Sequence, residues 1–324
     1  FSGSKEHNVA IRTLGVKNGL KINEYGVFQS GEESAGEEER LGGEREEVVF
    51  SALNLPWISP LLRENRGELD AAREDRLPRL LTVKDIRGDL QMHSTWSDGA
   101  NSILEMAEAC RDRGYEYLSI TDHSQSVTVA NGLDPARVRH QWEEVEEVRK
   151  EMEGVRLFRS LEVDILKDGT LDMPEDILNS LDVVLVSVHT FMNMSKAEMT
   201  DRVIRAMENP LVDILAHPTG RILNRRPPFA MDVETVLQAA ASLDVAVELN
   251  AHPSRLDLHD RHLRRAKDLG VKVVVSTDAH SVQDLSLMSY GVDQAGRGWL
   301  EPVDVLNTMS VEEFQKWLGR RGKE

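Results

Sequence analysis

From residue 86 onward, short apolar runs alternate with longer segments in which apolar residues recur at helical spacing. Seven runs have the length of strands: "DLQMH", "YLSITDH", "LFRSLEVD", "VVLVSVH", "VDILAH", "VAVELN" and "VKVVVSTDAH". Strands this apolar are usually buried on both faces, and helical segments between them favour parallel strands joined by crossovers. The pattern therefore predicts an α/β fold, and seven repeats favour a barrel.

The helical segment after the first run shows the signals that bound these helices. Ser102 and Glu105 have the spacing of a capping box, and Gly114 provides a stop. Cys110, the single cysteine, falls in phase with Ala107 on the apolar face of this helix. We therefore expect a packed thiol in a reducing compartment, and an internal disulfide is excluded.

The first 85 residues follow a different pattern. A helix is expected over 5–18, stopped by Gly19, and a short strand over 22–27. A Glu- and Gly-rich segment, 29–47, is typical of a solvated acidic loop, and a short apolar helix is expected around 48–53. The expected parts are a small α+β unit over 1–55, too short to fold alone, a Pro- and charge-bearing linker over 56–85, and the barrel over 86–324.

The formal net charge of −17 argues against a general nucleic-acid-binding surface, because such surfaces are usually basic. Residues 32–47 alone account for −6 of this charge. No apolar run could cross a membrane and no signal-peptide pattern opens the chain, so we expect a soluble cytoplasmic protein without a membrane partner. The chain begins at Phe1 and its first methionine is Met92, so we expect a piece of a longer protein.

Histidines and acidic residues stand at the C-terminal edges of nearly all the apolar runs. In a parallel barrel those edges converge on one face, so a cluster is expected there. Five of the ten histidines occupy these edges, and of the other five only His252 is expected to be able to reach the site. The edge residues are His93, His123, Glu162, Asp164, His189, His217, Asp278 and His280.

Imidazole and carboxylate ligands together suit zinc, manganese or iron. Of these edge residues, all but Asp164 are candidate ligands, and with Asp98 they make eight, more than one ion needs. We therefore expect two or three ions, with Glu162 or Asp278 as a bridge. Multinuclear sites with ions about 3.5–4 Å apart catalyse in-line displacement at phosphorus. The expected chemistry is phosphoester hydrolysis.

A Pro-stiffened segment after His217, "HPTGRILNRRPPF", carries three arginines. Guanidinium groups match the geometry of phosphate oxygens, so Arg221, Arg225 and Arg226 are candidates for substrate binding, although each taken alone is equally well explained as solvating a loop. Lys196 is a weaker candidate, and we expect it to be a surface residue.

These motifs resemble the PHP (polymerase and histidinol phosphatase) domain in the version fused to bacterial X-family DNA polymerases. The resemblance covers about 86–318 through "DLQMHSTWSDG", "ITDHS", "LEVDIL", "VSVHT", "AHPTGR", "ELNAHPSRLDL" and "STDAHS". "FSGSKEHN" and "KINEYGVF" resemble the end of that polymerase's thumb, with Phe1 and Gly3 as its aromatic–glycine element. The resemblance implies a distorted seven-stranded barrel with a trinuclear metal centre that processes DNA 3′ ends as a 3′–5′ exonuclease during repair.

The ligand set implied by the resemblance adds position 91 to the eight residues above. Gln91 stands where most PHP domains have a histidine, and an amide oxygen is a weaker ligand than imidazole, so one ion is expected to bind less tightly. Catalysis is expected to depend on His93, Glu162, His217, Asp278, Arg221 and Arg225, and the ligands are expected to be Gln91, His93, Asp98, His123, Glu162, His189, His217, Asp278 and His280.

The implied partner is DNA, held together with polymerase domains that this chain lacks, so the chain alone is not expected to polymerise. Two alternatives stay open. One is a small-molecule phosphomonoesterase of the histidinol-phosphatase type, and the other is a non-catalytic structural or DNA-binding module. A thumb remnant favours DNA, because a metabolic phosphatase has no use for it.

Overall fold

The computed structural model of the chain describes residues 2–29 and 39–321. It divides into two compact units, Phe1–Arg79 and Leu80–Glu324. The boundary falls inside the segment 56–85, which the sequence assigns to a linker. Much of that segment is folded into the first unit, where Ile58, Leu62 and Ala72 are buried.

The first unit begins with helix α1, Lys5–Lys17, whose first turn is capped by the Ser4 hydroxyl. The chain then forms an antiparallel hairpin from β1, Leu20–Asn23, and β2, Gly26–Gln29. The expected single strand over 22–27 is therefore wrong. A turn interrupts it, in which the Asn23 side chain accepts a hydrogen bond from Tyr25 N at 2.9 Å and Gly26 adopts a φ of +140°.

Part of the segment predicted to be an acidic loop is regular structure. Strand β3, Arg40–Gly42, pairs antiparallel with β2, and helix α2, Glu46–Ala52, begins two residues earlier than expected. The loop prediction for 29–47 is wrong for these elements, because a strand of three residues leaves no periodic signal. Residues 30–38 of that segment, like Phe1, lie outside the described residues.

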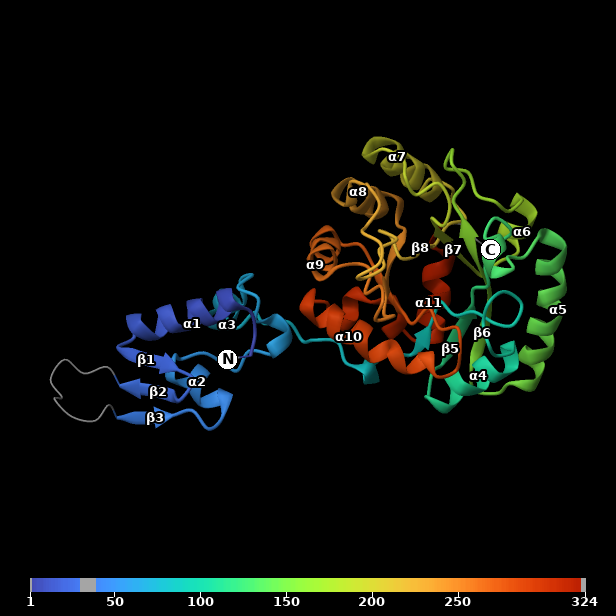
Figure 1. Cartoon of the computed structure of the whole chain (residues 1–324). Coiled ribbons are helices and arrows are strands. Elements are labelled where there is room, and N and C mark those ends of the chain that lie inside the picture. The colour runs from blue at the N-terminus through green and yellow to red at the C-terminus, as the bar shows by residue number, and fades with distance from the viewer. Residues whose placement is uncertain (1, 30–38, 322–324) are drawn as a thin grey trace. The chain divides into compact units, whose positions relative to one another are not determined.

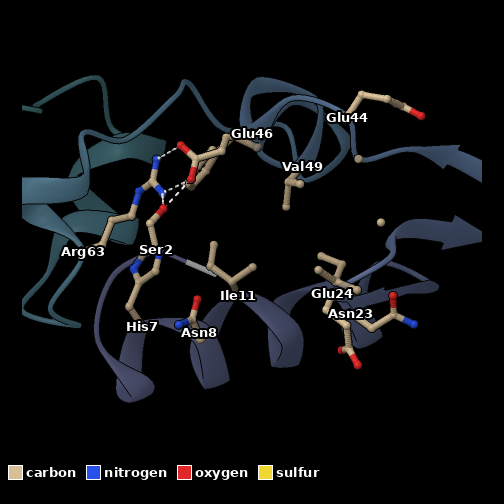
Figure 2. A pocket seen from close by; sticks show the side chains of 14 residues that line it. Ser2, His7, Asn8, Ile11, Asn23, Glu24, Glu44, Glu46, Val49 and Arg63 are labelled. Carbon is tan, nitrogen blue, oxygen red and sulfur yellow. Dashed lines mark hydrogen bonds and ion pairs between the residues drawn. The ribbon is translucent and has the colours of Figure 1, made fainter.

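In the rest of this unit a 3₁₀ turn, Pro60–Leu62, leads to α3, Glu68–Arg73. Two pairs of ionisable side chains connect these elements to the start of the chain and to α2. Arg63 donates to both carboxylate oxygens of Glu46 at 2.7 and 2.8 Å and lies over the Phe50 ring. His7 Nδ1 lies 2.5 Å from Glu68 Oε1, and both side chains are buried. Figure 2 shows Arg63, Glu46 and His7 on the wall of a pocket of about 170 Å³.

The second unit is a parallel barrel, which confirms the α/β prediction. Its strands hydrogen-bond in the order β10-β9-β8-β7-β6-β5-β4, and helices lie around them (Figure 1). The strands are β4 Gly88–Asp89, β5 Tyr117–Ile120, β6 Arg156–Asp164, β7 Val183–Ser187, β8 Ile214–Leu215, β9 Ala246–Asn250 and β10 Val273–Ser276. The helices are α4 Ile103–Asp112, α5 Pro135–Glu151, α6 Glu175–Asn179, α7 Lys196–Met207, α8 Val233–Leu243, α9 Asp260–Leu269, α10 Met288–Arg297 and α11 Val311–Leu318.

The two edge strands, β4 and β10, are not paired by a ladder of backbone hydrogen bonds in the described structure, so the barrel is distorted. Beyond the strands a single parallel bridge joins Met92 to Ala279. Below it, Asn307 donates to the carbonyl oxygens of Gly88 and Val275, both at 2.8 Å, and accepts from Val275 N at 3.0 Å. A fully buried asparagine therefore closes the seam.

One end of the barrel is filled with apolar side chains. Phe314 of α11 stacks on Tyr117 at 5.1 Å between ring centroids and meets the edge of Phe158 at 5.5 Å. These rings belong to a buried cluster that includes inward-facing residues of six strands. With that end closed, the opposite end, where the parallel strands finish, carries the polar residues.

The expectation of a packed thiol is confirmed, because Cys110 of α4 is fully buried with its sulfur 4.0 Å from that of Met92. Within residues 2–29 and 39–321, no helix combines the length and apolar character needed to cross a bilayer.

Candidate metal centre

Glu162, near the end of β6, lies at the middle of the cluster that the sequence predicts. Its carboxylate is 2.8 Å from His217 Nε2, 3.3 Å from His123 Nδ1, 3.5 Å from His189 Nε2 and 3.6 Å from His93 Nε2. Burial raises the pKa of this carboxyl, but the facing imidazoles outweigh burial and bring the pKa well below its usual value. The structure therefore places an ionised carboxylate among four imidazoles from four different strand ends.

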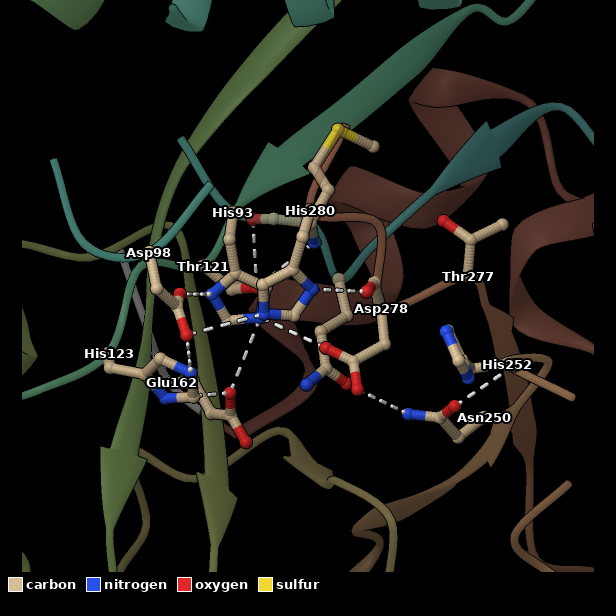
Figure 3. A network of polar contacts seen from close by, with 12 residues as sticks. His93, Asp98, Thr121, His123, Glu162, Asn250, His252, Thr277, Asp278 and His280 are labelled. Carbon is tan, nitrogen blue, oxygen red and sulfur yellow. Dashed lines mark hydrogen bonds and ion pairs between the residues drawn. The ribbon is translucent and has the colours of Figure 1, made fainter. Parts of the chain in front are cut away.

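A second group forms around Asp98, on the loop after β4 (Figure 3). Its carboxylate oxygens lie 3.5 Å from His280 Nε2, 3.6 Å from His123 Nε2 and 3.8 Å from His93 Nδ1. Burial disfavours the charge of Asp98, but the hydrogen bond from His280 and the nearby imidazoles lower its pKa to about 2. Burial likewise disfavours the charged form of His280, yet Asp98 and Asp278 raise its pKa to about 9.

The third corner is Asp278, after β10. His93 Nε2 lies 3.0 Å from its Oδ1, and Asn250 Nδ2 donates to its Oδ2 at 3.0 Å. The guanidinium of Arg255 lies 3.4 Å from the same Oδ2. Burial raises the pKa of Asp278, but His93 and Arg255 outweigh it, so the pKa is far below its usual value.

The loop that carries Asp98 is held by a buried carboxylate behind it. Asp122 accepts hydrogen bonds from Ser94 N at 2.8 Å, Ser94 Oγ at 2.6 Å, Ser97 Oγ at 2.5 Å and Gln141 Nε2 at 2.6 Å. Four donors satisfy this fully buried acid, and within the described part of the chain no opposite charge is bonded to it. Asp122 therefore fixes the path from His93 to Asp98, a role that the sequence reasoning missed.

The donor atoms that face the centre fit divalent ions. Two sets of ligand atoms each lie within 4.8 Å of one another: His93, Asp98, His123 and His280 form one set, and His123, Glu162 and His189 form the other. Among the described residues, several buried atoms here have no hydrogen-bond partner: Nδ1 of His93, His123 and His217, and Oε2 of Glu162. Buried polar atoms without a hydrogen bond are rare in proteins, so a cluster of them on neighbouring strand ends fits side chains whose partner is an ion.

Burial keeps two of the imidazoles in the neutral form that ligation requires. Burial lowers the pKa of His123 to about 3, so this ring is neutral at pH 7 and offers a lone pair. Burial lowers the pKa of His217 as well. In His189, burial acts in the same direction but the charges of Glu162 and Asp164 prevail and raise the pKa.

Gln91 is fully buried just after β4. Neither its Oε1 nor its Nε2 has a hydrogen-bond partner within the described part of the chain. A buried amide in this condition is compatible with an oxygen ligand, and its assignment as a ligand stays a prediction.

Two family models match the chain. One described as "PHP domain" matches residues 89–252, and one described as "DNA polymerase beta thumb" matches residues 1–64. A "Probable phosphatase" of Acetivibrio thermocellus is 32% identical over 249 residues, which cover 72% of this chain and 95% of that protein. The chain belongs to the PHP family. The resemblance read from the motifs is thereby confirmed, at both ends of the chain.

A longer relative matches both units of the chain. The "DNA polymerase/3'-5' exonuclease PolX" of Bacillus subtilis (strain 168) is 42% identical over 320 residues, or 99% of this chain, and the chain spans 55% of that protein's length. Among solved structures, histidinol phosphate phosphatase from Lactococcus lactis, complexed with zinc, L-histidinol and phosphate, has a TM-score of 0.49 at 16% identity, covering 65% of this chain and 94% of that one.

Of the three arginines predicted to bind substrate, two donate to backbone carbonyls and one is exposed. Arg221 donates to the backbone carbonyls of Arg255 and Leu256, and Arg226 donates to the carbonyl of Gly220 at 2.7 and 2.9 Å. Arg225 is exposed. The structure thus gives Arg221 and Arg226 a bracing role in two loops, while the catalytic roles assigned to Arg221 and Arg225 stay predictions.

Arg255 is the arginine that the sequence reasoning missed, although it stands in the motif "ELNAHPSRLDL". Its side chain is 18% exposed and points at Asp278, and its Nη1 is buried without a partner among the described residues. The loop that carries it is braced by Arg221 and by Asp257, which accepts from Thr219 N at 2.9 Å and Thr219 Oγ1 at 2.8 Å.

The five histidines away from the strand ends lie outside both ligand sets, and so does the strand-end residue His217. His252 is linked to the centre through one residue, since its backbone N donates to the Asn250 side chain, which in turn donates to Asp278 (Figure 3). Its ring nitrogen Nδ1 is paired with the Ser254 hydroxyl at 2.8 Å. Lys196 is exposed and pairs with Asp232 at 2.7 Å, as expected of a surface residue.

Proposed function

We propose that the PHP unit is a divalent-metal-dependent phosphodiesterase that removes nucleotides from DNA 3′ ends, a 3′–5′ exonuclease. The observation that carries this proposal is the Glu162 carboxylate within 3.6 Å of four imidazoles, several of whose buried nitrogens have no hydrogen-bond partner among the described residues. Such a set suits two or three zinc or manganese ions, held by the eight predicted residues with Gln91 as a weaker ninth.

When bound, these ions would supply Lewis-acid stabilisation of charge at phosphorus and activation of the attacking water. The chain's own residues orient the substrate. Arg255 presents a largely buried guanidinium at the edge of the cluster, whose Nη1 has no partner among the described residues, and a phosphate oxygen would satisfy that donor. Asp278, which also accepts from Asn250, holds the guanidinium of Arg255 in place. We therefore assign phosphate binding to Arg255 in place of Arg221 and Arg225.

The DNA substrate is proposed because the first unit matches a polymerase thumb and because PolX of Bacillus subtilis matches almost the whole chain. Polymerase domains in a longer protein would present the 3′ end and add basic surface to a chain whose formal net charge is −17. A role in repair in the cytoplasm is part of this proposal.

The test is release of mononucleotides from an oligonucleotide labelled at its 3′ end, with manganese added. We expect activity in the parent chain and a loss of at least about 100-fold in His93→Ala and in Asp278→Ala, because each removes a group shared by two parts of the centre. Equal rates in the parent and both variants would refute the assignment.

A second candidate is hydrolysis of small phosphomonoesters, favoured by the similarity to the probable phosphatase of Acetivibrio thermocellus over 95% of its length. Hydrolysis of an aryl phosphate by the same preparation, with no action on any oligonucleotide, would favour this candidate. A non-catalytic module would instead bind well under one equivalent of transition metal and stay inactive after metal addition.

A further inference from the structure

An exposed aromatic residue, Phe191, stands in the same loop as the candidate ligand His189, and phosphoester hydrolysis by itself does not account for it. Phe191 follows His189 by two residues in the loop between β7 and α7, and it is 59% exposed. Two residues of chain span at most about 7 Å, so the backbone of Phe191 lies close to that of a candidate ligand. A single exposed apolar side chain is common on protein surfaces, so exposure alone does not point to a use of Phe191, whereas the way its backbone is held and the contacts of its ring do.

The backbone on the N-terminal side of Phe191 is fixed by buried charge. His189 N and Thr190 Oγ1 donate to the carboxylate of Asp164, at 2.8 and 2.9 Å. Arg202 of α7, which is 2% exposed, donates to the carbonyl oxygens of Thr190 at 2.9 Å and Phe191 at 3.4 Å. The exposure of the ring is therefore not the result of a loosely held loop.

The residues after Phe191 turn inward while its own ring does not. Met192 and Met194 pack against the main hydrophobic core of the PHP unit. Phe191 itself adopts a φ of +49°, a left-handed conformation that a bulky residue rarely adopts. Burying this ring would remove apolar surface from water, so its strained and solvated placement indicates a use on the surface.

A cation accompanies the ring. Lys167 Nζ lies 5.7 Å from the centroid of the Phe191 ring, and Lys167 sits on a tight turn in the loop after β6. Arg202 holds that loop too, through the carbonyls of Ile165 and Leu166. One buried guanidinium thus ties together the two loops that present an aromatic face and a positive charge beside the metal centre.

We propose that Phe191 and Lys167 form a nucleobase-binding site at the rim of the metal centre. The ring stacks on the base of the 3′-terminal nucleotide, and the lysine ammonium contacts the DNA backbone next to it. We take the substrate to be a single-stranded or frayed 3′ end, whose terminal base is free to turn onto Phe191. This inference rests on the proposed exonuclease function and specifies its substrate.

The experiment compares two single-stranded oligonucleotides that differ only at the 3′-terminal residue, which is thymidine in one and a base-free tetrahydrofuran in the other. Hydrolysis by the full chain is measured with manganese for the parent, Phe191→Ala and Phe191→Trp. We expect Phe191→Ala to raise KM for the thymidine end about tenfold with kcat within twofold, since loss of one stacked base is worth about 1–3 kcal/mol. Phe191→Trp should keep the parent KM.

The base-free end gives the decisive control. The parent should bind it about as weakly as Phe191→Ala binds the thymidine end, and Phe191→Ala should cause no further loss on it. Tyr290→Ala, which removes an aromatic residue that is 51% exposed on α10, should match the parent on both ends. Equal losses on both ends, or none on the thymidine end, would overturn the base site while leaving the exonuclease intact. A parent chain inactive on both ends would overturn the proposed function and this site with it.

Discussion

Nε2 of His217 lies 2.8 Å from Oε1 of Glu162, although 55 positions separate them in the sequence. The contact forms because β6 and β8 both pair with β7, in parallel, so their C-terminal ends finish at the same face of the barrel. The same geometry brings His123 and His189 to Glu162. The Glu162 carboxylate therefore lies within 3.6 Å of four imidazoles and is the expected bridge between ions.

Glu162→Gln keeps the shape of this side chain and removes its charge. We expect the variant to bind at least one divalent ion fewer than the parent and to lose at least about 100-fold in phosphodiesterase rate, because amide oxygens ligate more weakly than carboxylates. Metal per chain is measured by elemental analysis and the rate with a labelled oligonucleotide. Glu143→Gln, at a side chain 77% exposed on α5, is the matched control, and full metal content in Glu162→Gln would contradict the bridging role.

The choice between arginines can be tested directly. Arg255→Ala should lower kcat about 100-fold, typical of losing one donor to developing charge, while metal content stays unchanged. Arg255→Lys should recover little, because an ammonium cannot reproduce the guanidinium fork. The opposite result would be a kcat about 100-fold lower in Arg225→Ala and unchanged in Arg255→Ala. It would show that Arg225, as predicted from the sequence, binds the phosphate.

The sequence was sufficient to predict the barrel because its strands are continuous apolar runs and its helices carry capping signals. It was also sufficient to predict which strand ends meet, since parallel topology gathers them whatever the loops do. It could not show which arginine points inward, because Arg221 and Arg255 lie on irregular loops where spacing has no structural meaning. The hairpin around Tyr25 was missed for a related reason, since four-residue strands are too short for a clear period.

Metal affinity should rise with pH. His280 has a pKa of about 9 in the metal-free protein, so it is protonated at pH 7 and must lose its proton before its ring can ligate. Asp98, with a pKa of about 2, and His123, with a pKa of about 3, are already in their ligating forms. His280 alone therefore contributes about a tenfold gain in affinity per pH unit between pH 6.5 and 8.5.

Manganese titrations of the metal-free protein at pH 6.5, 7.5 and 8.5 measure this slope. His280→Asn should bind more weakly at pH 8.5 and show a slope smaller by about one proton, since the titrating ring is gone. An affinity independent of pH in the parent would mean that His280 does not ligate.

Asn307 ties the stability of the barrel to the integrity of the metal centre. Its side chain satisfies backbone groups of both edge strands, β4 and β10, and no sequence pattern marks a contact that spans 219 positions to Gly88. Asn307→Ala would leave these buried groups without partners, at a cost of about 3 kcal/mol. For a unit of this size we expect the melting temperature of the barrel to fall by about 6–12 °C in chelator.

The seam also positions ligands, because β4 leads to His93 and β10 leads to Asp278, whose side chains are 3.0 Å apart. Loosening it should weaken metal binding as well as the fold, so Asn307→Ala should need more manganese for half-maximal activity at 20 °C. Asn193→Ala, at an exposed position in the loop before α7, should change neither quantity. A lower melting temperature with unchanged manganese dependence would show that His93 and Asp278 are held together by the ions alone, independently of the barrel seam.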